Sequence, residues 1–402
     1  MAKIGCCSIW YLRDGRQKLL VIYLDNNATT RLDPKVLEAM MPFLTEDYAN
    51  AASTHPFGLS ANEAVKLARK QVADLINCEP SEIVFTSGAT EAINLAIKGV
   101  AESYKDKGKH IVTVQTEHPA VLDVCKYLEA NGCEVTYLPV QPDGLLDLKV
   151  VQKAIRSDTI LVSVMMVNNE TGVIQPIQEI ASLAHEVGAL FMTDATQAAG
   201  KIPIDVEEVG IDLLTLSGHK MYGPKGIGAL YARHKKPRRV KLATQLHGGG
   251  HERGMRSGTL NVPGIVGLGK ATELSRKLMS EDATRIKGLR DELEAELLKI
   301  SGTRVNGNQN HRLYNITNIL FEGCDSDAMI MGLEGIIVSN GSACTAALIE
   351  PSHVLLAMGL NHNEASSSLR FSLGRCNLKT NTSYIINSVS KETTNLRAMV
   401  TN

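Results

Sequence analysis

The sequence predicts an α/β fold in which a large domain with a mostly parallel central sheet is joined to a smaller α+β domain. Between residues 80 and 235, short β-type runs alternate with helical runs of roughly 10–15 residues, as in successive βαβ units. After about residue 275, a charged helical pattern leads into further β-type runs and a closing helix. Polar residues gather where the predicted strands end, the edge at which parallel sheets bind ligands.

The elements of the large domain follow one another in a regular order. The expected strands are 82–86, 110–115, 134–140, 159–167, 189–195 and 212–218. The helical runs between them are 87–104, 118–132, 147–156 and 176–188. In the small domain, residues 283–300 have an amphipathic helical pattern and residues 314–321 a β-type pattern. The tail after residue 378 is polar and irregular in pattern.

We therefore expect residues 33–275 to form the large domain, and residues 21–32 together with 276–402 to form the small one. Residues 1–20 are expected to be a poorly ordered N-terminal extension before a first strand near Val21. Their apolar core is too short for a secretory signal. Two alternatives stay open: a weak organellar presequence, or a native start near Val21 with the extension an artefact of the assigned start.

The composition excludes several classes of protein. With 44% hydrophobic and 21% charged residues, the chain is typical of a soluble globular protein. A net charge of −1 argues against a nucleic-acid partner. No apolar run approaches the roughly 20 residues of a membrane span. The eight cysteines show no CxxC pair or metal-type spacing and are interpreted as reduced thiols, which favours a cytoplasmic location. If the extension is a presequence, an organellar matrix replaces the cytoplasm.

The segment TSGATEA (86–92) ends a predicted strand and opens a helix. Backbone N–H groups and the helix dipole make such a turn an anion site, and Thr90 adds a hydroxyl. A tight turn with a Ser/Thr cap is the alternative. The turn is not a nucleotide P-loop, because the sequence contains no GxxxxGK[ST].

Two charged residues also follow predicted strands. Asp194 ends the run 189–195, and Lys220 follows the run 212–218. Taken alone, Asp194 is explained by a cap or a salt bridge, just as His118 is explained as a loop histidine. An anion turn, an aspartate and a lysine at one sheet edge together suggest pyridoxal phosphate. The turn would bind the phosphate, Asp194 the pyridine nitrogen, and Lys220 would form the Schiff base.

Nine segments, in order from Tyr23 to about residue 378, resemble the cysteine desulfurases of the NifS/IscS type, within the class-V aminotransferase family. They are YLDNNATT (23–30), FTSGATEAINLAIKG (85–99), EHPAV (117–121), VNNETG (167–172), DATQAAGKIPIDV (194–206), SGHKMYGPKGIGALY (217–231), HGGGHERGMRSGTLNVPGIVG (247–267), GSACT (341–345) and SLRFSLGR (368–375). The resemblance implies the pyridoxal-phosphate-dependent transferase fold of type I.

The resemblance also implies roles for individual residues. Lys220 matches the Schiff-base lysine, Asp194 the partner of the pyridinium, and His118 an imidazole stacked on the ring. Arg370 matches the arginine that binds the substrate carboxylate. The other matches to cofactor-binding positions are Ala89, Thr90, Asn169 (also near the substrate), Gln197, Ser217, His219 and Thr259. In the family, the residue at the position of Thr259 reaches the phosphate of the other subunit, which implies a homodimer.

Cys344 lies in SNGSACTAA (339–347), where small residues dominate. A structural cysteine is instead expected among large apolar neighbours. The resemblance makes Cys344 the nucleophile that accepts sulfur, on the loop of the long-loop subgroup. It implies a sulfurtransferase that converts L-cysteine to L-alanine and leaves a persulfide on Cys344. Lys220 would remove the α-proton, with His118 as a further acid–base residue.

The implied partners are L-cysteine and a sulfur acceptor: an iron–sulfur scaffold protein or a thiolation protein. No intrinsic metal is implied, although Cys344 would be available to share a transient iron–sulfur cluster with a scaffold. The identity of the acceptor and the use of selenocysteine stay open. One departure from the family pattern is Asn50-Ala51-Ala52-Ser53 in place of Asn-Pro-Ser-Ser, with an effect that is not readable from sequence.

Other functions fit the sequence less well. A transaminase has no need of a cysteine such as Cys344 in a loop of small residues. The HGGG at 247 is similar to an esterase oxyanion motif, but the chain contains no GxSxG. A non-catalytic descendant of the family is expected to lose Lys220 or Cys344, and both are present.

Overall fold

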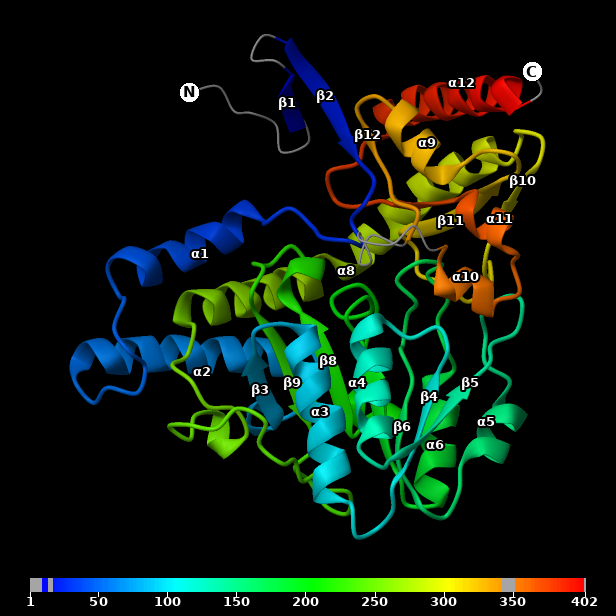
Figure 1. Ribbon diagram of the computed structural model, residues 1–402. Coiled ribbons are helices and arrows are strands. Elements are labelled where there is room, and N and C mark those ends of the chain that lie inside the picture. The colour runs from blue at the N-terminus through cyan, green and yellow to red at the C-terminus, as the bar shows by residue number, and fades with distance from the viewer. Residues whose placement is uncertain (1–8, 14–16, 342–350, 401–402) are drawn as a thin grey trace.

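The computed structural model describes residues 9–13, 17–341 and 351–400, in which a large lobe carries a smaller one (Figure 1). The large lobe is built on a seven-stranded sheet of order β3–β9–β8–β7–β6–β4–β5. Its strands are β3 (Ile83–Thr86), β4 (His110–Val114), β5 (Glu134–Leu138), β6 (Thr159–Ser163), β7 (Leu190–Asp194), β8 (Leu213–Ser217) and β9 (Gly228–Ala232). Strand β9 is antiparallel to both of its neighbours, β3 and β8, and the remaining pairs in the sheet are parallel. The predicted α/β class with a mostly parallel sheet is confirmed.

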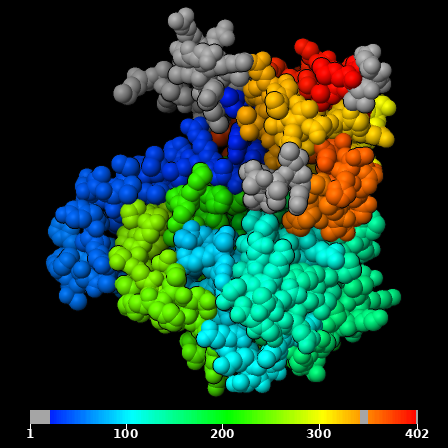
Figure 2. Space-filling model, in the orientation of Figure 1, coloured from blue at the N-terminus to red at the C-terminus, as the bar shows by residue number. Residues whose placement is uncertain are grey.

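Helices cover both faces of this sheet. Successive side chains of a strand point to opposite faces, and both faces carry apolar side chains that the helices bury. Val112 and Leu214 pack into the apolar core beneath α2 (Pro56–Ile76), α6 (Ile177–Glu186) and α8 (Val262–Leu297). Ile111 and Leu213 pack into the core beneath α3 (Ala89–Ser103) and α4 (Pro119–Ala130). The helices of the large lobe are α1 (Pro34–Thr45), α2 (Pro56–Ile76), α3 (Ala89–Ser103), α4 (Pro119–Ala130), α5 (Leu148–Ala154), α6 (Ile177–Glu186) and α7 (Val206–Val209). Helices α1 and α2 project from one side as an arm (Figures 1 and 2).

The small lobe has two three-stranded sheets, of order β10–β11–β13 and β1–β2–β12. Their strands are β1 (Ile9–Arg13), β2 (Gln17–Tyr23), β10 (Thr303–Val305), β11 (Ile316–Phe321), β12 (Ile336–Ile337) and β13 (Ser368–Ser372). The helices are α9 (Ser326–Gly332), α10 (His353–Ala357), α11 (His362–Ser366) and α12 (Thr382–Val400). Most of the tail after residue 378 thus lies in helix α12, although its sequence pattern is irregular. Its Ile385 and Val389 are buried in the core of the lobe.

Helix α8 (Val262–Leu297) belongs to both lobes. Its first half contributes Leu268 and Leu274 to the core of the large lobe, and its second half contributes Leu289 and Leu293 to the core of the small lobe. The expected division at residue 275 falls inside this continuous helix. Among the described residues, no helix is long and apolar enough to cross a membrane.

The N-terminal expectation needs a correction. Strand β2 begins at Gln17 instead of near Val21, and its residues 17–21 pair with β1. Residues 9–13 and 17–20, assigned from sequence to a poorly ordered extension, are thus paired strands. The physical reason is that β1 supplies hydrogen-bonding partners to residues 17–21, while β12 pairs with Ile22 and Tyr23 at the other end of β2. Residues 1–8 and 14–16 lie outside the described part.

Candidate active site

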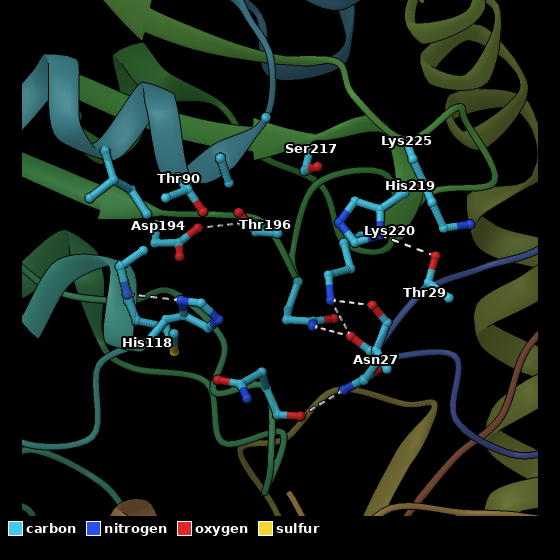
Figure 3. A pocket seen from close by; sticks show the side chains of 18 of the residues that line it. Asn27, Thr29, Thr90, His118, Asp194, Thr196, Ser217, His219, Lys220 and Lys225 are labelled. Atoms are coloured by element: carbon cyan, nitrogen blue, oxygen red, sulfur yellow. Dashed lines mark hydrogen bonds between the residues drawn. The ribbon is translucent and has the colours of Figure 1, made fainter. Parts of the chain in front are cut away.

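A cavity of about 600 Å³ lies at the carboxyl ends of β3, β7 and β8, where the small lobe meets the large one (Figure 3). The turn after β2 closes one side with Asn27, Ala28 and Thr29, and β13 contributes Arg370. Because both lobes supply walls, the site depends on how the lobes pack. Hydrogen bonds between them, such as Gln197 Nε2 to Asn27 O at 2.9 Å, hold this arrangement.

Lys220 enters the cavity from a short 3₁₀ turn, η2 (Gly218–Lys220), directly after β8. Its Nζ donates to the carbonyl oxygens of Asn27 at 2.6 Å and Ala28 at 2.7 Å. These carbonyl dipoles stabilise the ammonium and hold it in the cavity. A partly buried lysine that contacts backbone oxygens from the other lobe is placed for chemistry.

Asp194 ends β7 on the opposite wall and is 5% exposed. Its Oδ1 accepts from Thr196 N at 2.9 Å and from Thr215 Oγ1 at 3.2 Å, so the carboxylate is fixed in orientation. Glu117 is fully buried nearby. Burial, and then the charge of Asp194, raise the pKa of Glu117 well above its ordinary value. Asp194 and Lys220 therefore give the cavity an anionic and a cationic wall.

The anion turn joins β3 to α3 at Ser87, Gly88 and Ala89. Glu91, in the first turn of α3, accepts from Ser87 N at 2.7 Å and from Arg256 Nε at 2.7 Å. The glycines of GPKGIG allow β9 to return against this turn, since a Cβ at Gly228 would lie 2.7 Å from Gly88 Cα. The local sequence thus places the amino end of α3 at the cavity.

Two histidines line the cavity in a neutral state. His118 is the N-cap of α4, and its Nδ1 accepts from Ala120 N at 3.1 Å. Burial lowers the pKa of His118, so at pH 7 its proton resides on Nε2. Burial, followed by the charge of Lys220, lowers the pKa of His219 to about 4. His219 Nδ1 lies 3.1 Å from Thr29 Oγ1.

Arg370 reaches the cavity from β13 and has a side chain that is 3% exposed. Its Nη2 contacts Asp25 Oδ1 at 2.6 Å, and its Nη1 donates to Asn169 O at 3.1 Å. Its Nε has no hydrogen-bond partner among the described residues. The guanidinium is thus held in place with one buried donor available to a ligand.

Gln197 is held by a second lysine. Lys201 Nζ donates to Gln197 O at 3.1 Å and Gln197 Oε1 at 3.0 Å. Because Oε1 accepts from Lys201, the amide nitrogen of Gln197 is directed to Asn27 O at the cavity wall. Sequence reasoning identified Gln197 but not this orienting contact.

Ten of the twelve site residues expected from sequence line this cavity: Ala89, Thr90, His118, Asn169, Asp194, Gln197, Ser217, His219, Lys220 and Arg370. Thr259 does not line it and is exposed on the surface. Cys344 lies outside the described residues, and Gly341, three positions before it, lines the cavity.

Several lining residues were missed, among them Asn27, Ala28, Thr29, Thr196 and Lys225. The signal was present for the first three, because the polar run NNATT follows a β-type run as the other strand-end clusters do. Its connection to Lys220 depends on lobe packing, which no local pattern encodes.

Comparison with known proteins places these residues in a family. The aminotransferase class-V pattern matches residues 22–384. The chain is 52% identical over 381 residues to "Cysteine desulfurase IscS" of Escherichia coli O139:H28 (strain E24377A / ETEC), with 94% of each chain covered. A solved "NIFS-LIKE PROTEIN" is 38% identical with a TM-score of 0.86, covering 92% of this chain and 98% of that one. "SspA in complex with cysteine" is 40% identical with a TM-score of 0.78, covering 87% and 98%.

Proposed function

The chain belongs to the class-V aminotransferase family and, within it, to the cysteine desulfurases of the NifS/IscS type, and from this premise we propose how its residues perform the reaction. The enzyme converts L-cysteine to L-alanine and transfers the sulfur to an enzyme cysteine, which we assign to Cys344. The observation that carries the assignment is the juxtaposition of Lys220, Asp194 and Arg370 around one cavity.

The residues of the cavity fit pyridoxal 5′-phosphate. Arg370 and Thr196 line the cavity, and their buried atoms Nε and Oγ1 lack partners among the described residues, as expected where an anionic ligand supplies acceptors. Asp194 would pair with the pyridine nitrogen and His118 would lie against the ring. The remaining positions would hold the phosphate (Ala89, Thr90, Ser217, His219) and the ring oxygen (Asn169, Gln197). When bound, the cofactor accepts the electron pair released at the substrate α-carbon.

Residues of the chain itself bind the substrate and transfer its protons. Arg370 binds the substrate carboxylate, for which its planar guanidinium is suited. Lys220 Nζ takes the α-proton, since its position after β8 sets it in the cavity. His118, neutral with its proton on Nε2, is suited to donate a proton within the site.

The sulfur transfer step balances without an external oxidant. The thiolate of Cys344 attacks the sulfur of the substrate and forms the S–S bond. The substrate C–S bond breaks, its electron pair stays on the carbon, and a proton at that carbon completes alanine. Attack on sulfur requires the thiolate form of the cysteine and access of that thiolate to the substrate.

We further propose a homodimer. Large apolar side chains are exposed on the arm: Leu37, Met41, Leu44, Phe57, Leu59 and Leu67. Such a surface is typical of a protein–protein interface. Exposed Thr259 would reach the phosphate of the partner's cofactor.

A second partner would be the sulfur acceptor, which is an iron–sulfur scaffold or a thiolation protein. The proposed location of the enzyme is the cytoplasm.

Replacement of Lys220 by Ala tests the assignment. We expect the variant to lose the cofactor's protein-bound absorbance and its alanine formation. Lys299→Ala, an exposed lysine on the small lobe paired with Glu296, is the matched control and should keep both. In the wild-type enzyme given L-cysteine without reductant, mass spectrometry should find the extra sulfur on the peptide that contains Cys344. Near-normal turnover by Lys220→Ala, or sulfur on another cysteine, would contradict the proposal.

A further inference from the structure

Glu170 is a buried acid that the assigned mechanism does not use. It follows Asn169 of the cavity wall and is 3% exposed. Burial raises the pKa of Glu170, opposed first by the hydrogen bond from Ser352. Its backbone is fixed as well, because Asn168 Oδ1 accepts from Glu170 N at 2.9 Å and Asn318 Nδ2 donates to Glu170 O at 3.2 Å. Burying a carboxylate is unfavourable unless its oxygens are used.

The carboxylate contacts two points of the chain that flank Cys344. Ser352 Oγ donates to Glu170 Oε2 at 2.5 Å. Gly341 packs on the same oxygen so closely that a Cβ at Gly341 would lie 2.4 Å from it. Gly341 also has a φ of +90°, so only glycine fits this position readily. One oxygen therefore lies against both Gly341 and Ser352, which stand before and after Cys344 in the chain.

Each end is also tied to the catalytic cavity. Before Gly341, Ser339 O accepts from Arg370 N at 2.6 Å, and Ser339 Oγ accepts from Gly341 N at 3.1 Å. After Ser352, His353 Nε2 lies 3.0 Å from Glu117 O, the residue before His118. Glu170 lies between these two attachments.

We propose that Glu170 is a positioning residue for sulfur transfer, fixing Gly341 and Ser352 beside the cavity so that the segment between them delivers Cys344 to the substrate. This inference rests on the proposed function. Holding Gly341 and Ser352 at the cavity lowers the entropic cost of bringing a group that the chain carries between them to the substrate. The hydrogen bonds that hold the Arg370 guanidinium, to Asp25 and to Asn169 O, do not involve the Glu170 carboxylate, so binding of L-cysteine should be separable from sulfur transfer.

The test compares Glu170→Leu, Glu170→Gln, Ser352→Ala and the double variant Glu170→Leu/Ser352→Ala as holoenzymes. Leu keeps the approximate volume of Glu but removes both oxygens, Gln keeps an acceptor for Ser352, and Ala removes the donor. Two quantities are measured for each: the change in cofactor absorbance on binding L-cysteine, and the single-turnover rate of persulfide formation on Cys344. Glu82→Leu is the matched control, since Glu82 is a buried acid that accepts from backbone amides far from the cavity.

We expect Glu170→Leu and Ser352→Ala each to slow persulfide formation by roughly tenfold or more, with binding of L-cysteine within twofold of wild type. The double variant should be no slower than the slower single variant, because each single variant already removes the same hydrogen bond between Ser352 and Glu170. Glu170→Gln should retain most of the rate, and Glu82→Leu should match wild type per folded holoenzyme.

Wild-type rates in Glu170→Leu, additive losses in the double variant, or a parallel loss of cofactor binding would each overturn the inference. Failure of the proposed function is distinguishable, because the wild-type enzyme itself would then form no persulfide on Cys344.

Discussion

Replacing Arg370 with Lys should weaken use of L-cysteine while the cofactor site is kept. In the structure one guanidinium serves several partners: Nη2 contacts Asp25, Nη1 donates to Asn169 O, and Nε is available to the substrate. An ammonium is a point charge with no planar fork, so it cannot hold Asp25 and Asn169 O in this geometry and also present a donor to the substrate carboxylate.

The magnitude follows from the hydrogen bonds that are lost. A hydrogen bond to a charged group contributes about 1.5–3 kcal/mol. Loss of one such bond to the substrate carboxylate corresponds to a decrease of roughly 10- to 150-fold in kcat/KM. Steady-state alanine formation at varied L-cysteine concentration measures this ratio, and the absorbance of the bound cofactor measures retention of the site. We expect the loss to appear mainly in KM.

Arg312→Lys is the matched control for this experiment. Arg312 is also buried and forms a bidentate pair with Glu294, with both distances 2.6 Å, but it does not line the cavity. It should lose stability and keep the wild-type KM. A KM within twofold of wild type in Arg370→Lys, or an equal increase in Arg312→Lys, would refute the reasoning.

Three further predictions concern other buried charges. Glu252→Ala should lower the free energy of unfolding by about 3–5 kcal/mol, because it removes the partner of Arg69, which contacts Glu252 at 2.6 and 2.8 Å. Urea denaturation measures this loss, and a value below about 1 kcal/mol would contradict the prediction. Asp194→Asn should fold but lose roughly 100-fold in alanine formation, since Thr196 N keeps an acceptor while the anionic wall is lost, and near-normal turnover would contradict this role. Burial lowers the pKa of Lys201 from its ordinary 10.5 to about 7. Between these values the unfolded chain binds a proton that the folded chain does not, so stability rises with pH. Between pH 7.5 and 9.5, the free energy of unfolding of the wild type, measured with urea, should therefore rise relative to that of Lys201→Met by up to about 1.4 kcal/mol per pH unit. Parallel pH profiles of the two proteins would exclude this linkage.

The sequence located the parts of the site that lie at the ends of local elements. Asp194 and Lys220 follow strands whose apolar runs are visible in the chain, and the anion turn precedes a helix with a clear pattern. The expected strands from 82–86 to 212–218 all contain strands of the observed sheet. Local patterns are sufficient for these features because the strands, except β5 at the edge of the sheet, are buried along their whole length and therefore appear as apolar runs.

Other features arise only from packing between distant segments. The carbonyl oxygens of Asn27 and Ala28 reach Lys220 because the turn after β2 docks across the lobes. Strand β9 enters the sheet antiparallel, and Lys201 orients Gln197 through a buried contact. Helix α12 forms from a polar tail because its few apolar residues meet the core of the small lobe. No single window of sequence contains these partners.

The docking of the turn after β2 has a consequence for synthesis of the protein. Asn27 N donates to Ser372 Oγ, a contact that joins residues 345 positions apart. The carbonyl oxygens that hold Lys220 therefore cannot be fixed until β13 has left the ribosome. At about 5–20 residues per second, that delay is roughly 20–70 s after the turn itself has been made. During this interval the large lobe can form its sheet while one wall of the site is still missing, so the nascent enzyme acquires its complete site only as translation ends.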